Sequence, residues 1–233
     1  MALLWSLVFV DPLVIISTVF FGSISLLASL FDKRGDFMIQ TARVWARSLL
    51  LFAGVKVKVE GLDKLDPNTS YVFASNHLSY MDTPVVLSKI PWPFRFMAKN
   101  GLFKIPLLGT HLKQAGHSPV PRKDPRAAVK TMSQAAESIR TRRISILIFP
   151  EGGRSHSGVL QPFKDGAAYI AIKAGVPLVP LAIVGSREIL AMHSGTFHRG
   201  NVVLRIGDPI FPAGHDRKTL TEAARHQVSS LLR

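Results

Sequence analysis

Apolar positions are densest at the start of the chain. Ala2–Phe31 contains one charged residue, Asp11, and Leu13–Phe31 is a run of 19 uncharged residues. A run of this length can cross a bilayer as a helix. Pro12 separates it from a shorter apolar run, and a second apolar stretch, Ser48–Val55, is too short to cross. We therefore predict a membrane-anchoring motif over residues 1–54, in which the first helix spans the bilayer or lies in one leaflet and the second is an interfacial return helix.

Two alternatives exist for this apolar segment. Met1–Val10 has no positive n-region, and no clear small-residue cleavage site follows it, which argues against a cleaved secretory signal. A buried pair of core helices stays open, although 19 uncharged residues are long for a soluble helix. The first cations, Lys33 and Arg34, follow the apolar run, so we expect the rest of the chain on the cytoplasmic face of the membrane, the inner membrane if the source is bacterial.

From residue 55 onward, strand-like and helix-like patterns alternate. The predicted strands are Val55–Glu60, Tyr71–Ser75, Phe94–Ala98, Ile144–Phe149, Leu178–Val184 and Asn201–Ile206. The predicted helices are Ala167–Ala174, Arg217–Leu232 and one that opens at Asp124-Pro125. This alternation predicts an α/β fold, a three-layer catalytic domain over residues 55–233 with a mixed, largely parallel central sheet flanked by helices.

Composition narrows the chemistry and the partners. The 233 residues include no cysteine, which excludes disulfides, thiolate zinc sites, iron–sulfur clusters and cysteine nucleophiles. The net charge is +14, and residues 99–143 contribute +8 of it. A basic and apolar chain suits an anionic lipid surface or nucleic acid. Because no nucleic-acid-binding motif accompanies the charge, we expect the lipid bilayer as partner, and we interpret Arg140–Arg143 as a solvated face or a headgroup contact.

The most informative polar segment follows the Tyr71–Ser75 strand. His77 and Asp82 are five residues apart, about 140° out of phase on one helix, but they can meet if His77 lies in the strand-to-helix turn and Asp82 in the first helical turn. Ser79 is then expected to cap the helix. In this geometry Asp82 orients the imidazole of His77, which becomes a general base. The alternative is a capped helix with a partly buried histidine.

Further polar turns are candidates for binding a phosphate. The strand Ile144–Phe149 runs into a turn that contains Glu151, Gly152 and Arg154. Ligands of open α/β sheets bind at the carboxyl ends of strands, glycines let the backbone approach them, and arginine offers a planar fork for phosphate. Arg122, in the basic segment, is another candidate phosphate ligand, with a solvated loop arginine as the alternative. Lys99, after a short strand, is a similar but weaker candidate.

Taken in order, these residues resemble the glycerolipid acyltransferase family, specifically the 1-acyl-sn-glycerol-3-phosphate (lysophosphatidic acid) acyltransferases. The resemblance covers roughly residues 40–210. Four blocks carry it: N-H-x-S-x-x-D at Asn76, His77, Ser79 and Asp82; a glycine and an arginine six residues later at Gly116 and Arg122; F-P-E-G-x-R-S from Phe149 to Ser155; and V-P-x-V-P from Val176 to Pro180.

The resemblance implies that His77 deprotonates the sn-2 hydroxyl of a lysophospholipid acceptor, which attacks an acyl thioester directly. Asp82 would orient His77, Asn76 and Ser79 would support the motif, and the headgroup would be bound by Glu151, Gly152, Arg154, Arg122 and Lys99. The acyl donor would be acyl-CoA or acyl-carrier protein, with no metal and no further cofactor. Nucleic acid is not an expected partner.

Two departures from the family keep the acceptor open. The variable position of the third block is commonly Thr but is Gly153 here, and the second block is unusual in its inner residues. An acyltransferase for another lyso-lipid, such as lyso-ornithine lipid, is therefore the alternative. A non-enzymatic basic membrane-binding protein is a remoter one. A serine hydrolase is disfavoured because the chain lacks a G-x-S-x-G elbow.

Overall fold

One seven-stranded sheet organises the protein. The structure is a computed structural model that describes residues 2–121, 124–155 and 157–233. The strands run in the order β1-β7-β6-β2-β5-β3-β4. Their bounds are β1 Val55–Glu60, β2 Val72–Ser75, β3 Phe94–Lys99, β4 Ser118–Val120, β5 Ser145–Ile148, β6 Leu178–Val184 and β7 Gly200–Ile206.

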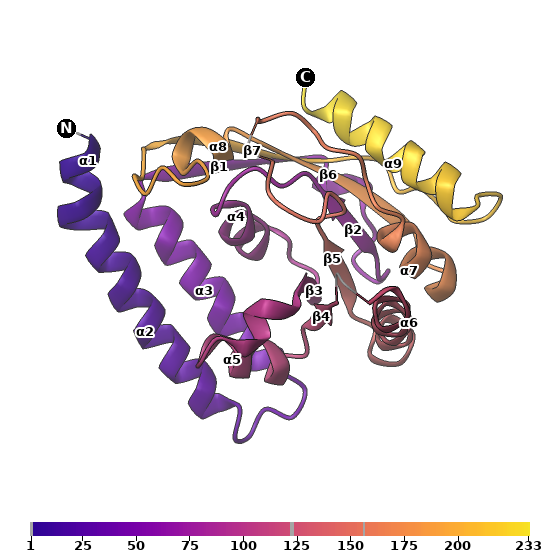
Figure 1. Ribbon diagram of the computed structural model, residues 1–233, viewed down its shortest axis with the longest axis horizontal. Helices are drawn as coiled ribbons and strands as arrows, with labels where there is room; N and C mark the ends of the chain where they lie inside the picture. Colours follow the sequence, from indigo (N-terminus) through magenta and orange to yellow (C-terminus); the bar gives the residue numbers. More distant parts are fainter. Residues whose placement is uncertain (1, 122–123, 156) are drawn as a thin grey trace.

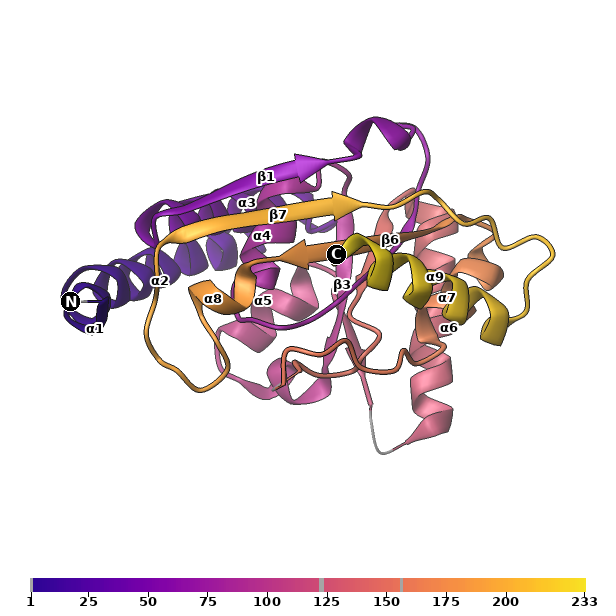
Figure 2. The same ribbon diagram turned by 90° about the horizontal axis from the view of Figure 1, so that it is seen from above.

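The sheet is mixed and mostly parallel, as predicted. The five neighbours from β6 to β4 are mutually parallel, whereas β7 is antiparallel to β6 and parallel to the edge strand β1. The opposite directions of β6 and β7 can be followed in Figure 2. Because β2 and β5 are parallel neighbours, the turns that follow them open at the same edge of the sheet. This brings two segments far apart in the sequence together.

Helices cover both faces of the sheet, which makes the three predicted layers (Figure 1). One face packs against α3 and α4 and the other against α6, α7 and α9. The helices are α1 Ala2–Trp5, α2 Asp11–Ala28, α3 Asp36–Phe52, α4 Asp82–Lys89, α5 Leu108–Gln114, α6 Pro125–Arg142, α7 Gly166–Ala174, α8 Ser186–Ile189 and α9 Arg217–Leu231, with a π turn η1 Ser6–Val10 and 3₁₀ turns η2 Leu62–Lys64 and η3 Asn100–Lys104.

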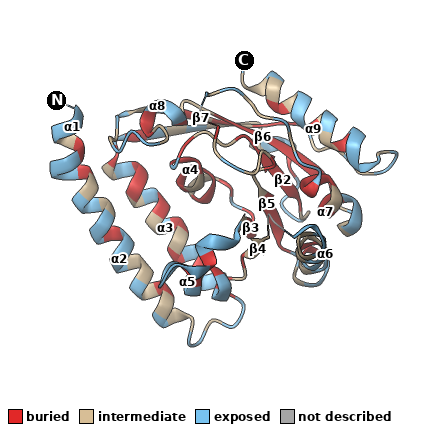
Figure 3. Ribbon diagram, viewed as in Figure 1, coloured by how far each residue is buried: buried red, intermediate tan, exposed pale blue. Residues whose placement is uncertain are grey.

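The alternation of side chains along β2 shows why both layers are needed. Phe73 points into the core shared with α3 and α4, whereas Val72 and Ala74 point into the core shared with α6 and α7. All three are fully buried. In Figure 3 the central strands are correspondingly buried, while the outer faces of the helices are exposed. A strand buried on both faces reads as a continuous apolar run, which is how β2, β5 and β6 appear in the sequence.

The N-terminal apolar segment is one continuous helix. Pro12 does not divide it, contrary to the expectation from the sequence. The residues directly before Asp11 and Pro12 form the π turn η1, and the helix continues from this turn into α2. In this turn the N–H of Asp11 donates to the carbonyl of Ser6, five residues back. Within the described residues, Ala2–Ala28 is the one helix long and apolar enough to cross a membrane, by length and composition only.

This helix lies on the outside of the fold. Of the 18 consecutive residues that are most apolar in this helix, only 11% are buried. This rules out the alternative that it is a buried core helix. The return helix α3 begins at Asp36, well before the apolar stretch Ser48–Val55 that suggested it, and its amphipathic face packs on α4. Ser17 of α2 and Ser48 of α3 share a hydrogen bond of 2.7 Å. The division of the chain at residues 54 and 55 remains a prediction.

Candidate active site

His77 and Asp82 lie together in the turn between β2 and α4. Asn76 is the residue directly after β2 and His77 is the next one, whereas Asp82 is the first residue of α4. Nδ1 of His77 and Oδ2 of Asp82 are 2.8 Å apart. Because a carboxylate can only accept, Nδ1 donates this hydrogen bond, and in the neutral imidazole the lone pair is then on Nε2. The predicted proximity of the two side chains is confirmed, whereas their catalytic role is still a prediction.

The carboxylate of Asp82 is completely buried and fully hydrogen-bonded. Its Oδ2 also accepts from the backbone N–H of Leu78 at 2.7 Å and of Ser79 at 2.9 Å. Its Oδ1 accepts from the hydroxyl of Ser186 at 2.5 Å. These donors offset the cost of burying a charge and fix the carboxylate in place. Ser186 begins α8 after β6, so no spacing within the first motif could reveal it.

Ser79 does not cap α4, so that expectation is wrong. The helix begins at Asp82 with Met81 as its N-cap, which makes no side-chain cap. The hydroxyl of Ser79 instead donates to the carbonyl of Leu190 at 2.7 Å and accepts from the N–H of Met81. Asn76 makes a similar link, because its amide bonds both the carbonyl and the N–H of Ile183 in β6. Both residues therefore hold the His77 turn to neighbouring segments.

The turn after β5 packs directly on His77. The ring of Phe149 stacks on the imidazole with centroids 3.9 Å apart, and the N–H of Ser155 donates to the carbonyl of His77. Oε1 of Glu151 accepts from the N–H of His77 at 2.6 Å, and Oε2 accepts from the N–H of Gln161. Burial raises the pKa of Glu151, and the two backbone donors oppose that rise. The carboxylate of Glu151 thus links the His77 turn to the loop after β5 by hydrogen bonds. Its expected role in binding the headgroup stays a prediction.

Two cations lie beside this turn. The guanidinium of Arg154 stacks on the ring of Tyr80 at 4.1 Å, and its Nε donates to the carbonyl of Ser79. Among the hydrogen bonds of the described residues, Nε is the only nitrogen of this guanidinium that donates one. The ammonium of Lys164 lies over Gly152, since a Cβ added to Gly152 would be 2.9 Å from Nζ. No motif in the sequence pointed to Lys164.

The other residues that the sequence predicted for the site are Lys99, Gly116 and Arg122. Lys99 ends β3, the neighbour of β5, and is exposed at the same edge of the sheet. Gly116 precedes the short edge strand β4, with φ of +80°. Arg122 lies outside the described residues. Among the described residues, no group of three His, Cys, Asp or Glu side chains could hold a metal ion.

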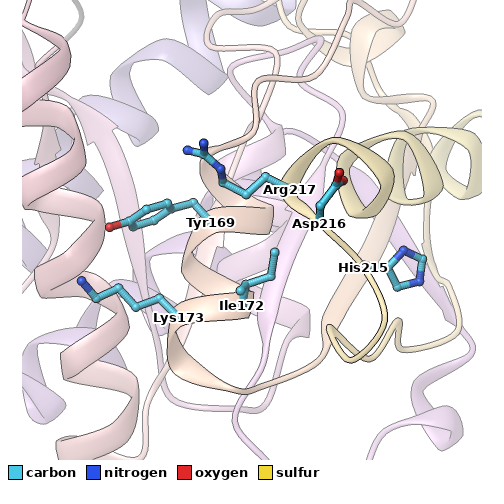
Figure 4. Close-up of a pocket in the computed structure, with 6 residues that line it drawn as sticks. All are labelled: Tyr169, Ile172, Lys173, His215, Asp216 and Arg217. Carbon is cyan, nitrogen blue, oxygen red and sulfur yellow. The ribbon is translucent and has the colours of Figure 1, made fainter.

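A hollow elsewhere on the molecule is not part of this site. It lies between α7 and the start of α9 (Figure 4). Its lining residues are Tyr169, Ile172, Lys173, His215, Asp216 and Arg217. The residues that line it include none of those described in the His77 turn or in the Glu151 turn. The candidate active site is therefore the pair of turns at the carboxyl ends of β2 and β5.

Comparison with known proteins shows the family to which this chain belongs. The profile of the acyltransferase family matches residues 56–184, which contain His77, Asp82, Glu151 and Arg154. The chain belongs to this acyltransferase family.

Curated proteins of known name are similar to this chain. The chain is 36% identical over 203 residues to a chloroplast 1-acyl-sn-glycerol-3-phosphate acyltransferase of Brassica napus, covering 86% of this chain and 58% of that protein. It is 30% identical over 195 residues to the alpha enzyme of the same name from Mus musculus, covering 80% of this chain and 68% of that protein. The chain thus spans little more than half the length of its plant relative.

A solved structure matches almost the whole chain. The crystal structure of the 1-acyl-sn-glycerophosphate (LPA) acyltransferase PlsC from Thermotoga maritima superposes with a TM-score of 0.80 at 26% identity. The match covers 99% of this chain and 98% of that one. It therefore includes the N-terminal helices as well as the sheet.

Proposed function

We propose that this protein transfers a fatty acyl group from an acyl thioester to the sn-2 hydroxyl of 1-acyl-sn-glycerol-3-phosphate, which gives phosphatidic acid. The observation that carries the proposal is the hydrogen bond of 2.8 Å between the partly exposed His77 and the buried Asp82, beside a turn with two cations. Membership of the acyltransferase family and the names of the curated relatives support the same reaction.

His77 acts as the general base in this proposal. Its Nε2 accepts the proton of the sn-2 hydroxyl while Asp82 stabilises the imidazolium that forms. The hydroxyl oxygen bonds to the thioester carbonyl carbon, and the carbon–sulfur bond then breaks. The proton held on Nε2 passes to the leaving thiolate, which restores the neutral imidazole. The stacked ring of Phe149 and the hydrogen bond to Asp82 fix the imidazole in one orientation for both transfers.

The acceptor's phosphate would bind beside the Glu151 turn. Arg154 supplies a planar guanidinium whose direction is fixed by Tyr80, and Lys164 adds a second cation over Gly152. Arg122 and Lys99 would extend this positive region from the neighbouring segments. An anionic acceptor and an anionic donor, acyl-CoA or acyl-carrier protein, are both attracted to such a face. The site needs no metal and no further cofactor for this chemistry.

The bilayer would present the acceptor. The helix Ala2–Ala28 exposes its apolar side chains and is the proposed anchor, with the catalytic domain on the cytoplasmic face. An acyltransferase for another lyso-lipid remains the second candidate, because Gly153 stands where the family commonly has Thr. Apart from its chain neighbours, none of the described residues lies within 4 Å of its Cβ position.

An acceptor panel tests the proposal. The purified chain in vesicles is supplied with acyl-CoA and with lysophosphatidic acid, other lysophospholipids or lyso-ornithine lipid, and the products are identified by mass spectrometry. We expect phosphatidic acid as the preferred product. Efficient acylation of another lyso-lipid without turnover of lysophosphatidic acid would refute the acceptor assignment, and no acylation of any acceptor would refute the reaction.

A further inference from the structure

The segment between β3 and the end of α5 exposes four large apolar side chains. They are Leu102, Ile105, Leu107 and Leu108, which are 37%, 46%, 69% and 41% exposed. Phe103 and Leu112 in the same segment are buried and anchor it to the fold. An exposed apolar cluster on an otherwise packed segment indicates a surface that meets another apolar phase.

The backbone holds these side chains outward. Leu107 has φ of +63°, which non-glycine residues rarely adopt, and the N–H of Leu108 donates to the carbonyl of Pro106 at 2.7 Å to close a tight γ-turn. Gly109 then packs so closely on Phe103 that an added Cβ would lie 2.2 Å from its carbonyl oxygen. The outward position of Leu107 is therefore a fixed feature of the fold.

This apolar cluster adjoins the exposed N-terminal helix. α5 packs against α2, and Oγ of Ser25 lies 2.7 Å from Nδ1 of His111 (Figure 1). Lys104 and Lys113, both exposed, lie on the same segment. Leucines flanked by lysines are suited to a bilayer interface with anionic headgroups. The segment also starts at the end of β3, at the sheet edge where the His77 and Glu151 turns open.

We propose that residues 101–113 form a second membrane-contacting element, which holds the mouth of the His77 site at the lipid surface. Leu107 and its apolar neighbours enter the boundary between headgroups and acyl chains, and Lys104 and Lys113 bind anionic headgroups. The proposal rests on the proposed function, because that function places the acceptor in a bilayer.

The absence of cysteine allows a direct test. The variant Leu107→Cys provides a single thiol for the fluorophore NBD, and nitroxide-labelled lipids in phosphatidylcholine–phosphatidylglycerol vesicles quench NBD that enters the bilayer. Phe211→Cys is the matched control, since Phe211 is 68% exposed and belongs to the loop between β7 and α9. This loop lies at the end of the molecule opposite the N-terminus (Figure 2). Ile15→Cys, on the exposed face of α2, reports the anchor.

We expect quenching at the Leu107 and Ile15 positions and none at the Phe211 position. Quenching at Ile15 without quenching at Leu107 would overturn the proposal while leaving the anchor intact. An absence of quenching at all three positions would overturn both the anchor and the second element. A blue-shifted Leu107 label before vesicles are added would mean that a second copy of the chain covers the segment, which also overturns the proposal.

Kinetics separate this role from a structural one. Leu107→Glu should raise the KM for lysophosphatidic acid presented in vesicles by about fivefold or more, because a charge opposes insertion. The rate with a short-chain, monomeric lysophosphatidic acid should not change, and Phe211→Glu should change neither. An equal loss on both forms of the acceptor would mean that Leu107 supports the site itself, which contradicts the proposal. The quenching result stands even if neither acceptor is turned over.

Discussion

At the scale of single residues, Asp82 is the best-determined group of the site. It is buried completely, and hydrogen bonds from His77, Ser186 and two backbone amides converge on its two oxygens. A carboxylate surrounded only by donors is held as an acceptor. This environment fixes the tautomer of His77 and therefore the nitrogen that is free to take up a proton.

Asp82→Asn should lower kcat by about 10³-fold with little change in KM, because the amide cannot stabilise the imidazolium or enforce the tautomer. Ser186→Ala removes one donor to the same carboxylate and should have a much smaller effect. Steady-state kinetics together with melting temperatures measure both. A large rise in KM with kcat unchanged would assign Asp82 to acceptor binding instead.

Gly152 and Gly153 form a matched pair for substitution. Gly152 has φ of +78° and faces the ammonium of Lys164, so Gly152→Ala should destabilise the turn and lower activity. Gly153 has ordinary φ and open space around its Cβ position, so Gly153→Thr should fold at least as stably and stay active. Thermal melts and acyl-transfer rates test both variants. Equal effects of the two substitutions would contradict this account of the turn.

At the scale of elements, apolar runs predicted most strands well. The predicted bounds of β1 and β6 agree with the structure, and those of β2, β3, β5 and β7 differ by one residue at one or both ends. Strand ends depend on backbone pairing with neighbours, which a periodicity pattern does not contain. The N-cap of α6 was predictable for a local reason: the side chain of Asp124 accepts from the N–H of Ala127.

Short elements could not be predicted in this way. β4 has three residues and includes Pro119, which suits only an edge strand. α5 has seven residues and begins after the strained backbone of Leu107. The π turn before Pro12 was missed because it depends on a backbone hydrogen bond and not on a side-chain pattern.

His117 makes the base of β4 sensitive to acid. Burial, aided by His111 and Arg95, lowers the pKa of His117 to about 3, and its Nδ1 accepts from the N–H of Phe96 at 2.8 Å. Below its usual pKa of about 6.5 the unfolded chain binds a proton that the folded chain excludes until about pH 3. This group therefore lowers the free energy of unfolding as the pH falls through that range.

His117→Asn should flatten the loss of stability on acidification. Melting temperatures in detergent at about pH 7.5 and about pH 5 give the comparison, with His226→Asn on the exposed face of α9 as the control. The wild type and the control should lose more stability between these pH values than His117→Asn does. Equal losses in all three would show that His117 does not remain neutral in the folded protein.

At the scale of the whole molecule, the sheet order determines the site. The sequence indicated polar turns after two strands but not that β2 and β5 are neighbours, since strand pairing depends on contacts distant in the chain. Ser186 was missed for the same reason, because it reaches the site from α8. Lys164 was missed because the loop between β5 and α7 folds back and brings it over Gly152. The motif residues His77 and Asp82 were found because both belong to one short turn.

The most direct test of the account is the rate of acyl transfer by His77→Ala. The chain in vesicles is given lysophosphatidic acid and acyl-CoA, and the variant is compared with His226→Ala, which removes an exposed histidine of α9. We predict that His77→Ala loses about 10³-fold or more of the rate at an unchanged melting temperature, while His226→Ala keeps it. A His77→Ala variant that folds and transfers acyl groups at the wild-type rate would contradict the account.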